Sequence, residues 1–303
     1  MRAAFAGYGA VGRALALALR EAGVEVAAVA APPGGRGEED ARRDGMAVTG
    51  ADFLPLDPDL LVLAVPDDAI APAASRLAER LRGEHRKGPG ERVPLEAHHP
   101  LAIHLSGRFG LAPLAPLAEA GWRTAAWHPV QSFTRGAGPE KFAGITIVIT
   151  AGEGAGRDAG ALAALVGARA LTVREEDRPR YHHACVLAAN FLPLLLALGA
   201  RRLEGIVEEN GEGEGEGEGA RVLLPLVRGM VENMRESGPA AAVTGPVARD
   251  DLEAVLSHLE SETEETYRRL YRMLTCRLVD LAEEAGRMEP DRARVWRQTL
   301  GER

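Results

Sequence analysis

Three glycines near the start of the chain, Gly7, Gly9 and Gly12, constrain the fold more than any other feature of the sequence. They follow a short apolar run at residues 2–6 and open a segment with helical periodicity that ends at Gly23. At this spacing, the first glycine permits a tight turn, the second lets the backbone approach a pyrophosphate, and the third lets the helix pack closely on the strand. The pattern therefore predicts a dinucleotide-binding turn at a helix N-terminus. Its residues are Gly7, Tyr8, Gly9, Ala10, Val11 and Gly12.

Apolar runs and helical patterns alternate along the first half of the chain. Because the runs are continuously apolar, they indicate a sheet that is covered on both faces. A strand, crossover helix and strand in about thirty residues further indicates parallel pairing. We therefore predict an α/β fold, a doubly wound parallel Rossmann sheet, over residues 1–174. The predicted strands cover residues 2–6, 24–30, 60–65, 101–105, 124–127, 145–150 and 170–173, and the intervening helices cover 10–22, 70–81, 111–120 and 156–166.

Strand signals end near residue 174, and the remaining sequence has the period of helices. Residues 181–204 and 221–235 predict two helices, and one long apolar stripe runs through 251–285. We therefore predict an all-helical second domain over residues 175–303. Two segments resemble insertions: 82–94 is polar, and 208–219 carries Gly-Glu repeats that favour a solvated linker.

Composition excludes several classes of protein. The 303 residues carry 36 Lys plus Arg against 44 Asp plus Glu, a formal charge of −8, which argues against a nucleic-acid partner. Cys185 and Cys276 lack paired spacing, so we expect neither a disulfide framework nor a metal site. We therefore expect a cytoplasmic location. The apolar N-terminus is interpreted as folded structure rather than a signal peptide. Residues 184–200, with Asn190 and Pro193, are shorter than the roughly 20 residues of a membrane span, so we predict a buried helix and no membrane partner.

The residues after the second predicted strand indicate which cofactor is preferred, because an acidic residue there would bind a ribose 2′-hydroxyl. Here no carboxylate occurs until Glu38, while Arg36, Arg42 and Arg43 lie nearby. This favours a 2′-phosphate, and hence NADP in preference to NAD. The alternative is that these arginines are merely solvated.

Polar residues follow three successive predicted strands, at the sheet edge where ligands bind in open parallel sheets. Val65, Pro66 and Asp67 follow the third strand, and we expect Asp67 or Asp68 to cap a helix while the segment lines the cofactor site. Ser106 follows the fourth strand and is a candidate both for cofactor binding and for hydrogen bonding to substrate. His128 follows the fifth. A histidine there can donate a proton near neutral pH, although packing by Trp127 and a turn would also explain it.

The helical domain offers further candidate residues. His183 and Asn190 are seven residues apart and so share one helix face. We name His183 as the alternative proton donor, whereas Asn190 either bridges helices or binds substrate. His182 and His183 lack further ligands at metal-site spacing, so no metal is expected. Arg249 either holds a substrate carboxylate or forms a structural ion pair, and Asp250 or Asp251 is expected to cap the helix that follows.

Taken in order, six motifs resemble a known family: GYGAVGRALA, VPDDAIA, HLSG, HPVQSF, YHHACVLAANF and TGPVARDD. The resemblance is to Rossmann-like proteins with a helical C-terminal domain of unknown function. These are distant relatives of pyrroline-5-carboxylate reductase and of proteins with the 6-phosphogluconate-dehydrogenase-like C-terminal fold. It covers most of the chain, apart from residues 82–94, the Gly-Glu segment and the tail after about 285. It implies an NADP-binding oxidoreductase, often a dimer through its helical domain, and supplies no substrate.

Lysine usage narrows the chemistry within that resemblance. The chain has only two lysines, Lys87 and Lys141, in a polar insert and a glycine-rich loop. The β-hydroxyacid dehydrogenases, similar in architecture, use a lysine four residues before an asparagine, where this chain has Val186. A lysine-based mechanism is therefore not expected, and any proton transfer falls to the histidines. Pyrroline-5-carboxylate reductase, which works mainly by positioning an imine acid beside the nicotinamide, is the nearer model, and the HPVQSF loop occupies the comparable place.

We therefore expect an NADP-dependent oxidoreductase that reduces a C=N or C=O group of a small, carboxylate-bearing molecule. The alternative is a non-catalytic NADP-binding module that regulates or binds a partner. Because residues 181–204 are apolar on all sides, we also expect this helix to be buried at the centre of a homodimer. The sequence names neither the substrate nor the reaction direction.

Overall fold

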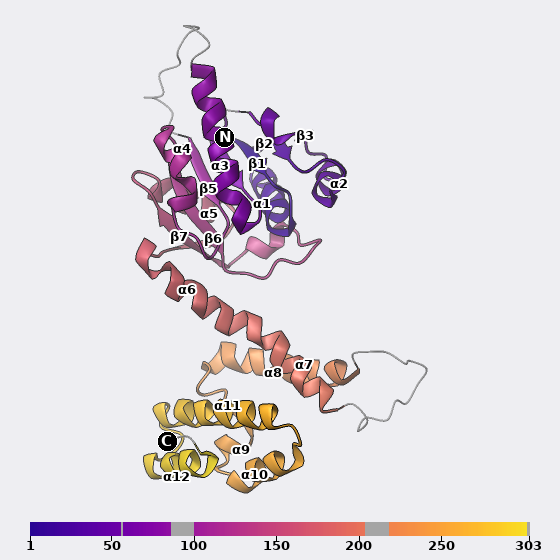
Figure 1. Ribbon diagram of the computed structural model, residues 1–303, viewed down its shortest axis with the longest axis vertical. Helices are drawn as coiled ribbons and strands as arrows, with labels where there is room; N and C mark the ends of the chain where they lie inside the picture. The colour runs from indigo at the N-terminus through magenta and orange to yellow at the C-terminus, as the bar shows by residue number, and fades with distance from the viewer. Residues whose placement is uncertain (56, 86–99, 204–217, 302–303) are drawn as a thin grey trace. The chain divides into compact units, whose positions relative to one another are not determined.

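The computed structural model describes residues 1–55, 57–85, 100–203 and 218–301 (Figure 1). These form two compact units, Met1–Ala189 and Asn190–Arg303. Lys87 and most of the two insertions lie outside the described residues. The units divide within a long helix, and the domain boundary expected near residue 174 lies between the last strand and the start of that helix.

The first unit contains one eight-stranded sheet with the order β3-β2-β1-β4-β5-β6-β7-β8. The order reverses beside β1, as in a doubly wound fold, which confirms the predicted fold class. One part of the prediction is wrong: β7 pairs antiparallel with β6, while all other pairings are parallel. The strands are β1 (Arg2–Ala6), β2 (Glu25–Ala30), β3 (Val48–Thr49), β4 (Leu60–Leu63), β5 (Leu101–His104), β6 (Arg123–Pro129), β7 (Thr146–Ala151) and β8 (Arg169–Thr172).

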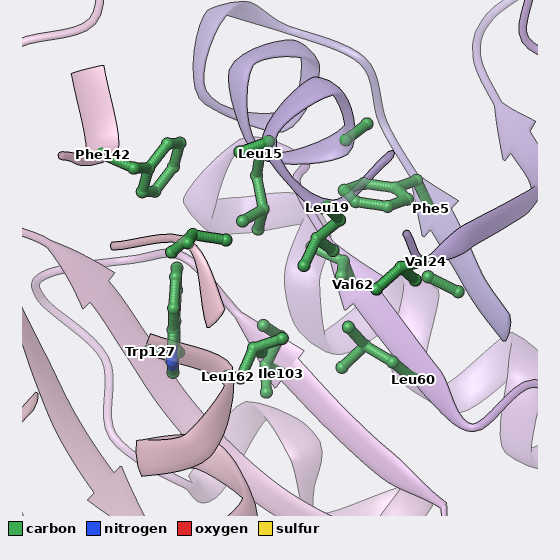
Figure 2. Packing of buried hydrophobic residues seen from close by; sticks show 14 of the residues in the cluster. Phe5, Leu15, Leu19, Val24, Leu60, Val62, Ile103, Trp127, Phe142 and Leu162 are labelled. Atoms are coloured by element: carbon green, nitrogen blue, oxygen red, sulfur yellow. The ribbon is translucent and has the colours of Figure 1, made fainter. Parts of the chain in front are cut away.

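Helices cover both faces of this sheet. Helices α1 (Ala10–Glu21) and α5 (Gly156–Leu165) pack on one face through a cluster that includes Leu15, Trp127 and Leu162 (Figure 2). Helices α3 (Asp67–His85) and α4 (Ala115–Glu119) pack on the other face. Alternate strand residues serve the two clusters, as the pleat requires. Both faces are therefore closed, and ligands have access to the strand ends rather than the faces.

Short elements complete the first unit. Helix α2 (Arg36–Arg43) was not expected, because its sequence RGEEDARR has only one buried residue, Ala41. Its (i, i+4) and (i, i+3) ion pairs compensate for the missing apolar stripe. The 3₁₀ turns are η1 (Ala51–Phe53), η3 (Ala112–Leu114), η4 (Pro139–Phe142) and η5 (Glu175–Asp177).

The long helix consists of α6 (Arg178–Cys185), a π-helical stretch at Val186–Asn190, and α7 (Phe191–Arg201). In the second unit α7 packs beside α8 (Glu218–Ser237). The single apolar stripe expected over 251–285 is divided by a break at Glu262–Glu264. The remaining helices are α9 (Gly245–Ala248), α10 (Leu252–Ser261), α11 (Glu265–Glu284) and α12 (Pro290–Leu300), around a core that includes Val255, Cys276, Val279 and Trp296.

Large apolar side chains remain exposed on the π-helical stretch, α7 and α8. Leu187, Phe191, Leu194 and Leu226 are between 45% and 66% exposed, so the prediction of a buried helix is wrong for the single chain. Residues Glu175–Arg201 form one helix that is long and apolar enough to cross a membrane, by length and composition alone. Exposed apolar patches of this kind mark interaction surfaces.

Candidate active site

The three glycines of the first turn play different geometric roles. Gly7 has φ +98°, and a Cβ there would overlap the carbonyl oxygen of Ala64. A Cβ on Gly12 would lie 2.7 Å from the Cβ of Ala64, so α1 can approach β4 only with glycine at this position. Gly9 has nothing within 4 Å of an added Cβ. The protein therefore needs Gly7 and Gly12 for its own packing, whereas the space beside Gly9 is open to a ligand.

The N-terminus of α1 has unpaired donors directed at that open space. Gly9 caps the helix without a side-chain hydrogen bond, and the first turn contains no acidic residue. The first N–H groups of a helix, here from Ala10, Val11 and Gly12, have no partner within the helix. The side chain of Tyr8 points elsewhere, because its hydroxyl donates to Asp44, which also pairs with Arg13. Any contribution of Tyr8 to the cofactor site thus comes from its backbone.

The three arginines after β2 are separated by the structure. Arg42 donates to Glu38 at 2.6 Å and Arg43 donates to Asp40 at 2.8 Å, so both are structural ion pairs within α2. Arg36 is the first residue of α2 and is exposed, with no ion pair to any described residue. Of the three, only Arg36 forms no ion pair with a described residue.

The segment after β4 borders the same edge of the sheet. Pro66 and Asp67 are exposed and Val65 is half-buried. Asp67 is the first residue of α3 rather than its cap, and its charge there is stabilised by the helix dipole. Burial lowers the pKa of both His104 and His128, and the negative charge of Asp67 acts against that shift.

His104 and Ser106 organise the loop after β5. His104 is fully buried, with its Nε2 2.7 Å from the carbonyl oxygen of Gly110, and its Nδ1 accepts the N–H of Ser106. These partners require the neutral ring with its proton on Nε2. The Ser106 hydroxyl oxygen accepts from the N–H groups of Arg108 and Phe109. Among the described residues, the hydrogen of this hydroxyl has no acceptor.

A buried arginine joins this loop to α6. Arg178 is 1% exposed, and its guanidinium donates to the carbonyl oxygens of Ser106 at 2.8 Å and Gly107 at 3.2 Å, and to the Thr150 hydroxyl at 3.1 Å. Its Nε has no hydrogen-bond partner. Because a buried cation raises the cost of a second positive charge nearby, Arg178 favours neutral histidines in this region.

His128 and Tyr181 form a hydrogen-bonded pair at the end of β6. The Tyr181 hydroxyl lies against Nδ1 of His128, with ring centroids 5.7 Å apart in an edge-on arrangement. Burial, followed by the charge of Arg178, lowers the pKa of His128 to about 4, and burial raises the pKa of Tyr181. The lowered pKa favours the neutral ring of His128 at neutral pH. Its role as a proton donor stays a prediction, and the pair with Tyr181 would offer a neutral donor.

The buried His104 makes stability depend on pH. Burial lowers its pKa to about 4 in the folded protein, against an ordinary value of 6.5. Between these values the unfolded chain binds the proton and the folded protein does not, so the free energy of unfolding falls as pH falls. We expect a loss of roughly 2 to 3 kcal/mol from this group between pH 7 and pH 4.5, measured by urea unfolding.

The matched variant for this prediction is His104→Gln, whose amide can still donate to Gly110 but does not titrate. It should lose correspondingly less stability over the same pH interval. An equal loss in the variant would show that His104 is not responsible.

The other predicted site residues are less defined by the structure. His183 is exposed on α6, and Asn190 is exposed at the end of the π-helical stretch, where its side chain forms no hydrogen bond with another described residue. Arg249 is exposed and forms no ion pair with the described residues. Asp251 caps α10 by accepting the N–H of Ala254, as expected of one of the two aspartates, while Asp250 pairs with Arg292.

Three residues of the site were not singled out from the sequence: His104, Arg178 and Tyr181. His104 and Tyr181 lie inside the motifs HLSG and YHHACVLAANF. Their roles depend on contacts with Gly110 and His128, which lie 6 and 53 positions away in the sequence. Arg178 has no local signal, because its partners, two backbone carbonyls and the Thr150 hydroxyl, are all distant in the sequence. Among the described residues no group of three or more His, Cys, Asp or Glu is arranged to hold a metal.

Comparison with known families agrees with this geometry. Residues 1–84 match the NADPH-binding domain of acetohydroxy acid isomeroreductase, and residues 145–278 match a domain of unknown function, DUF2520. The chain thus combines an NADP-binding Rossmann domain with a DUF2520 domain, which confirms the cofactor prediction and the family resemblance. A search of curated proteins finds no significant match.

Solved structures share the fold at low sequence identity. A Bacteroides fragilis protein, provisionally described as an NADP oxidoreductase, is 21% identical with a TM-score of 0.68, covering 91% of this chain and 97% of its own. A Thermotoga maritima protein, TM1727, is 21% identical with a TM-score of 0.67 and coverage of 93% and 99%. Pyrroline-5-carboxylate reductase from Streptococcus pyogenes is 12% identical with a TM-score of 0.56 and coverage of 99% and 98%. These likenesses establish the fold.

Proposed function

We propose that the protein is an NADPH-dependent reductase of a C=N or C=O group in a small, carboxylate-bearing molecule. The observation that carries this proposal is the His128–Tyr181 pair, which lies at the same sheet edge as the glycine turn. Ligands of doubly wound sheets bind at that edge. A cofactor bound at the glycine turn and a neutral proton donor after β6 are the two components that a reductase needs.

Bound NADPH supplies the hydride, and the protein supplies orientation and a proton. The Tyr181 hydroxyl keeps its proton at neutral pH because burial raises its pKa. The pair can therefore pass that proton, or the one on Nε2 of His128, to the substrate nitrogen or oxygen as the hydride adds to carbon. In this proposal the hydroxyl of Ser106 donates a hydrogen bond to the same substrate atom.

The remaining site residues belong to this proposal. His183 is the alternative donor, Asn190 a hydrogen-bonding partner and Arg249 the carboxylate anchor. The exposed, unpaired guanidinium of Arg249 supports that role, because a forked donor suits a carboxylate. The pyrroline-5-carboxylate reductase likeness suggests imine acids as the first substrates to try.

The experiment is a screen of NADPH oxidation, followed at 340 nm, against cyclic imine acids and 2-oxo acids. Turnover of at least one class, lost on replacing Tyr181 and His128, supports the proposal. NADPH binding without turnover of any compound would favour a non-catalytic NADP-binding module instead.

Arg36 should determine the preference for NADP over NAD. Arg36→Ala is expected to weaken NADPH binding roughly 10-fold, because one charge-assisted contact to the 2′-phosphate is lost. NADH binding should not change, and isothermal titration measures both. Arg42→Ala serves as the control, since Arg42 is already paired with Glu38. If Arg36→Ala leaves NADPH affinity unchanged, Arg36 does not contact the 2′-phosphate.

We further propose a cytoplasmic homodimer formed through the helical domain. The exposed apolar side chains of α7 and α8 support this, because a dimer would remove them from water. No disulfide joins Cys185 and Cys276, as in a reducing compartment. Light scattering should give about twice the chain mass of 32.2 kDa. A mass near that of one chain would contradict the dimer.

A further inference from the structure

The helical unit contains a cavity that the proposed reaction does not use. It has a volume of about 600 Å³ and lies among α7, α10 and α11, within the unit Asn190–Arg303. Cavities of 300 to 1,000 Å³ are typical of small-molecule sites. Its size therefore suits a ligand of one or two rings.

Five leucines form the aliphatic part of the cavity wall. Leu195 and Leu274 remain 43% and 39% exposed, so an apolar ligand would remove their side chains from water. Leu259 is buried and closes the inner side. The apolar lining residues are Leu195, Leu198, Leu259, Leu270 and Leu274.

A second histidine–tyrosine pair provides the polar part of the cavity. Nδ1 of His258 lies 2.7 Å from the Tyr271 hydroxyl, with ring centroids 5.9 Å apart at 71°. This hydrogen bond leaves Nε2 of His258 free. If Tyr271 donates, Nε2 carries the proton and can donate to a ligand carbonyl. If Nδ1 donates, the Tyr271 hydroxyl becomes the free donor, so the pair offers a donor in both tautomers.

The two charged side chains at the cavity, Arg202 and Glu262, already pair with each other. Both Nε and Nη2 of Arg202 donate to Glu262, at 2.9 and 2.6 Å, and the guanidinium stacks on Tyr267 at 3.7 Å from the ring centroid. An anionic ligand would have to compete with Glu262 for Arg202, and a cationic ligand would have to compete with Arg202 for Glu262. The arrangement therefore favours a neutral ligand.

We propose that this cavity is a binding site for a neutral, largely apolar small molecule that carries one carbonyl or hydroxyl group. The ring system lies against the leucines and the oxygen bonds to the His258–Tyr271 pair. The second unit alone forms this site, whereas the glycine turn belongs to the first unit, so the proposal does not depend on the reductase proposal.

The test uses three probes of similar size with the purified full-length protein: acetophenone, ethylbenzene and benzoate. Saturation-transfer NMR measures their binding with and without saturating NADPH. Acetophenone should bind saturably, benzoate at least 10-fold more weakly because it is charged, and ethylbenzene more weakly because it lacks the oxygen. NADPH should not displace acetophenone.

Three variants link the binding to the cavity. Leu274→Trp fills the cavity from an exposed position and should abolish binding, and His258→Ala should weaken acetophenone up to about 10-fold, as expected for one hydrogen bond. Ser257→Ala, on the same helix but outside the cavity, is the matched control and should bind normally. The proposal would be overturned if Leu274→Trp left acetophenone binding unchanged, if NADPH displaced acetophenone, or if acetophenone did not bind saturably. A dimer that excludes the probes, and that Leu274→Trp dissociates, would also overturn the proposal. In that case a second copy of the chain would occupy the cavity.

Discussion

Replacing Gly9 with alanine should remove measurable NADPH binding while the protein remains folded. The backbone at Gly9 has φ −77°, which any residue adopts, and an added Cβ has nothing within 4 Å. The fold therefore tolerates the methyl group. The cofactor would not, because a pyrophosphate must approach the backbone at this point of the turn. We expect affinity to fall by roughly 100-fold or more, which isothermal titration measures.

The control for this variant is Gly83→Ala in α3, another glycine with open space around its Cβ position. It should bind NADPH normally and be slightly more stable, since alanine favours helix. Gly7→Ala differs from both, because its positive φ and the Ala64 carbonyl make any side chain destabilising. Normal NADPH affinity in Gly9→Ala would place the cofactor elsewhere.

Tyr181→Phe should lower kcat by roughly 100- to 1,000-fold on any substrate that the protein reduces. General acid catalysis contributes about this much, and the substitution removes the hydroxyl but keeps the ring. NADPH affinity should be unchanged, since Tyr181 lies on α6 and not on the glycine turn. Stopped-flow assays of NADPH oxidation measure the rate.

A double variant separates a catalytic pair from two independent residues. If His128 and Tyr181 act together, His128→Ala combined with Tyr181→Phe should lose little more than either single variant. Losses that multiply would show that the hydrogen bond between them is not part of proton transfer. A full rate in Tyr181→Phe would exclude the tyrosine as donor and leave His183 to be tested.

Much of the first unit follows from local sequence patterns. The runs at residues 3–6 and Leu60–Leu63 are wholly apolar, and Gly7, Gly9 and Gly12 admit one kind of turn, so strand, turn and helix were predicted within two residues. The direction of β7 was not predictable in this way. A buried strand has the same apolar run whether it pairs parallel or antiparallel, and only its partner β6 decides.

The site was less predictable because its chemistry arises from burial. His128 stands out in sequence as a histidine after a strand, but its low pKa depends on Arg178, fifty residues later, and on the depth of the site. In the sequence, Arg42 and Arg43 cannot be distinguished from Arg36 as candidate phosphate ligands. In the structure, they pair within α2 with Glu38 and Asp40. Contacts in the folded protein thus distinguish among candidate residues that the sequence pattern alone treats as equivalent.

The most direct measurement is isothermal titration of the purified protein with NADPH, beside NADH at the same ionic strength. The account predicts saturable binding of one NADPH per chain, roughly 10-fold or more tighter than NADH, and a corresponding rise in melting temperature. No binding of either cofactor, and no rise in melting temperature at saturating concentration, would contradict the assignment of the glycine turn as an NADP site.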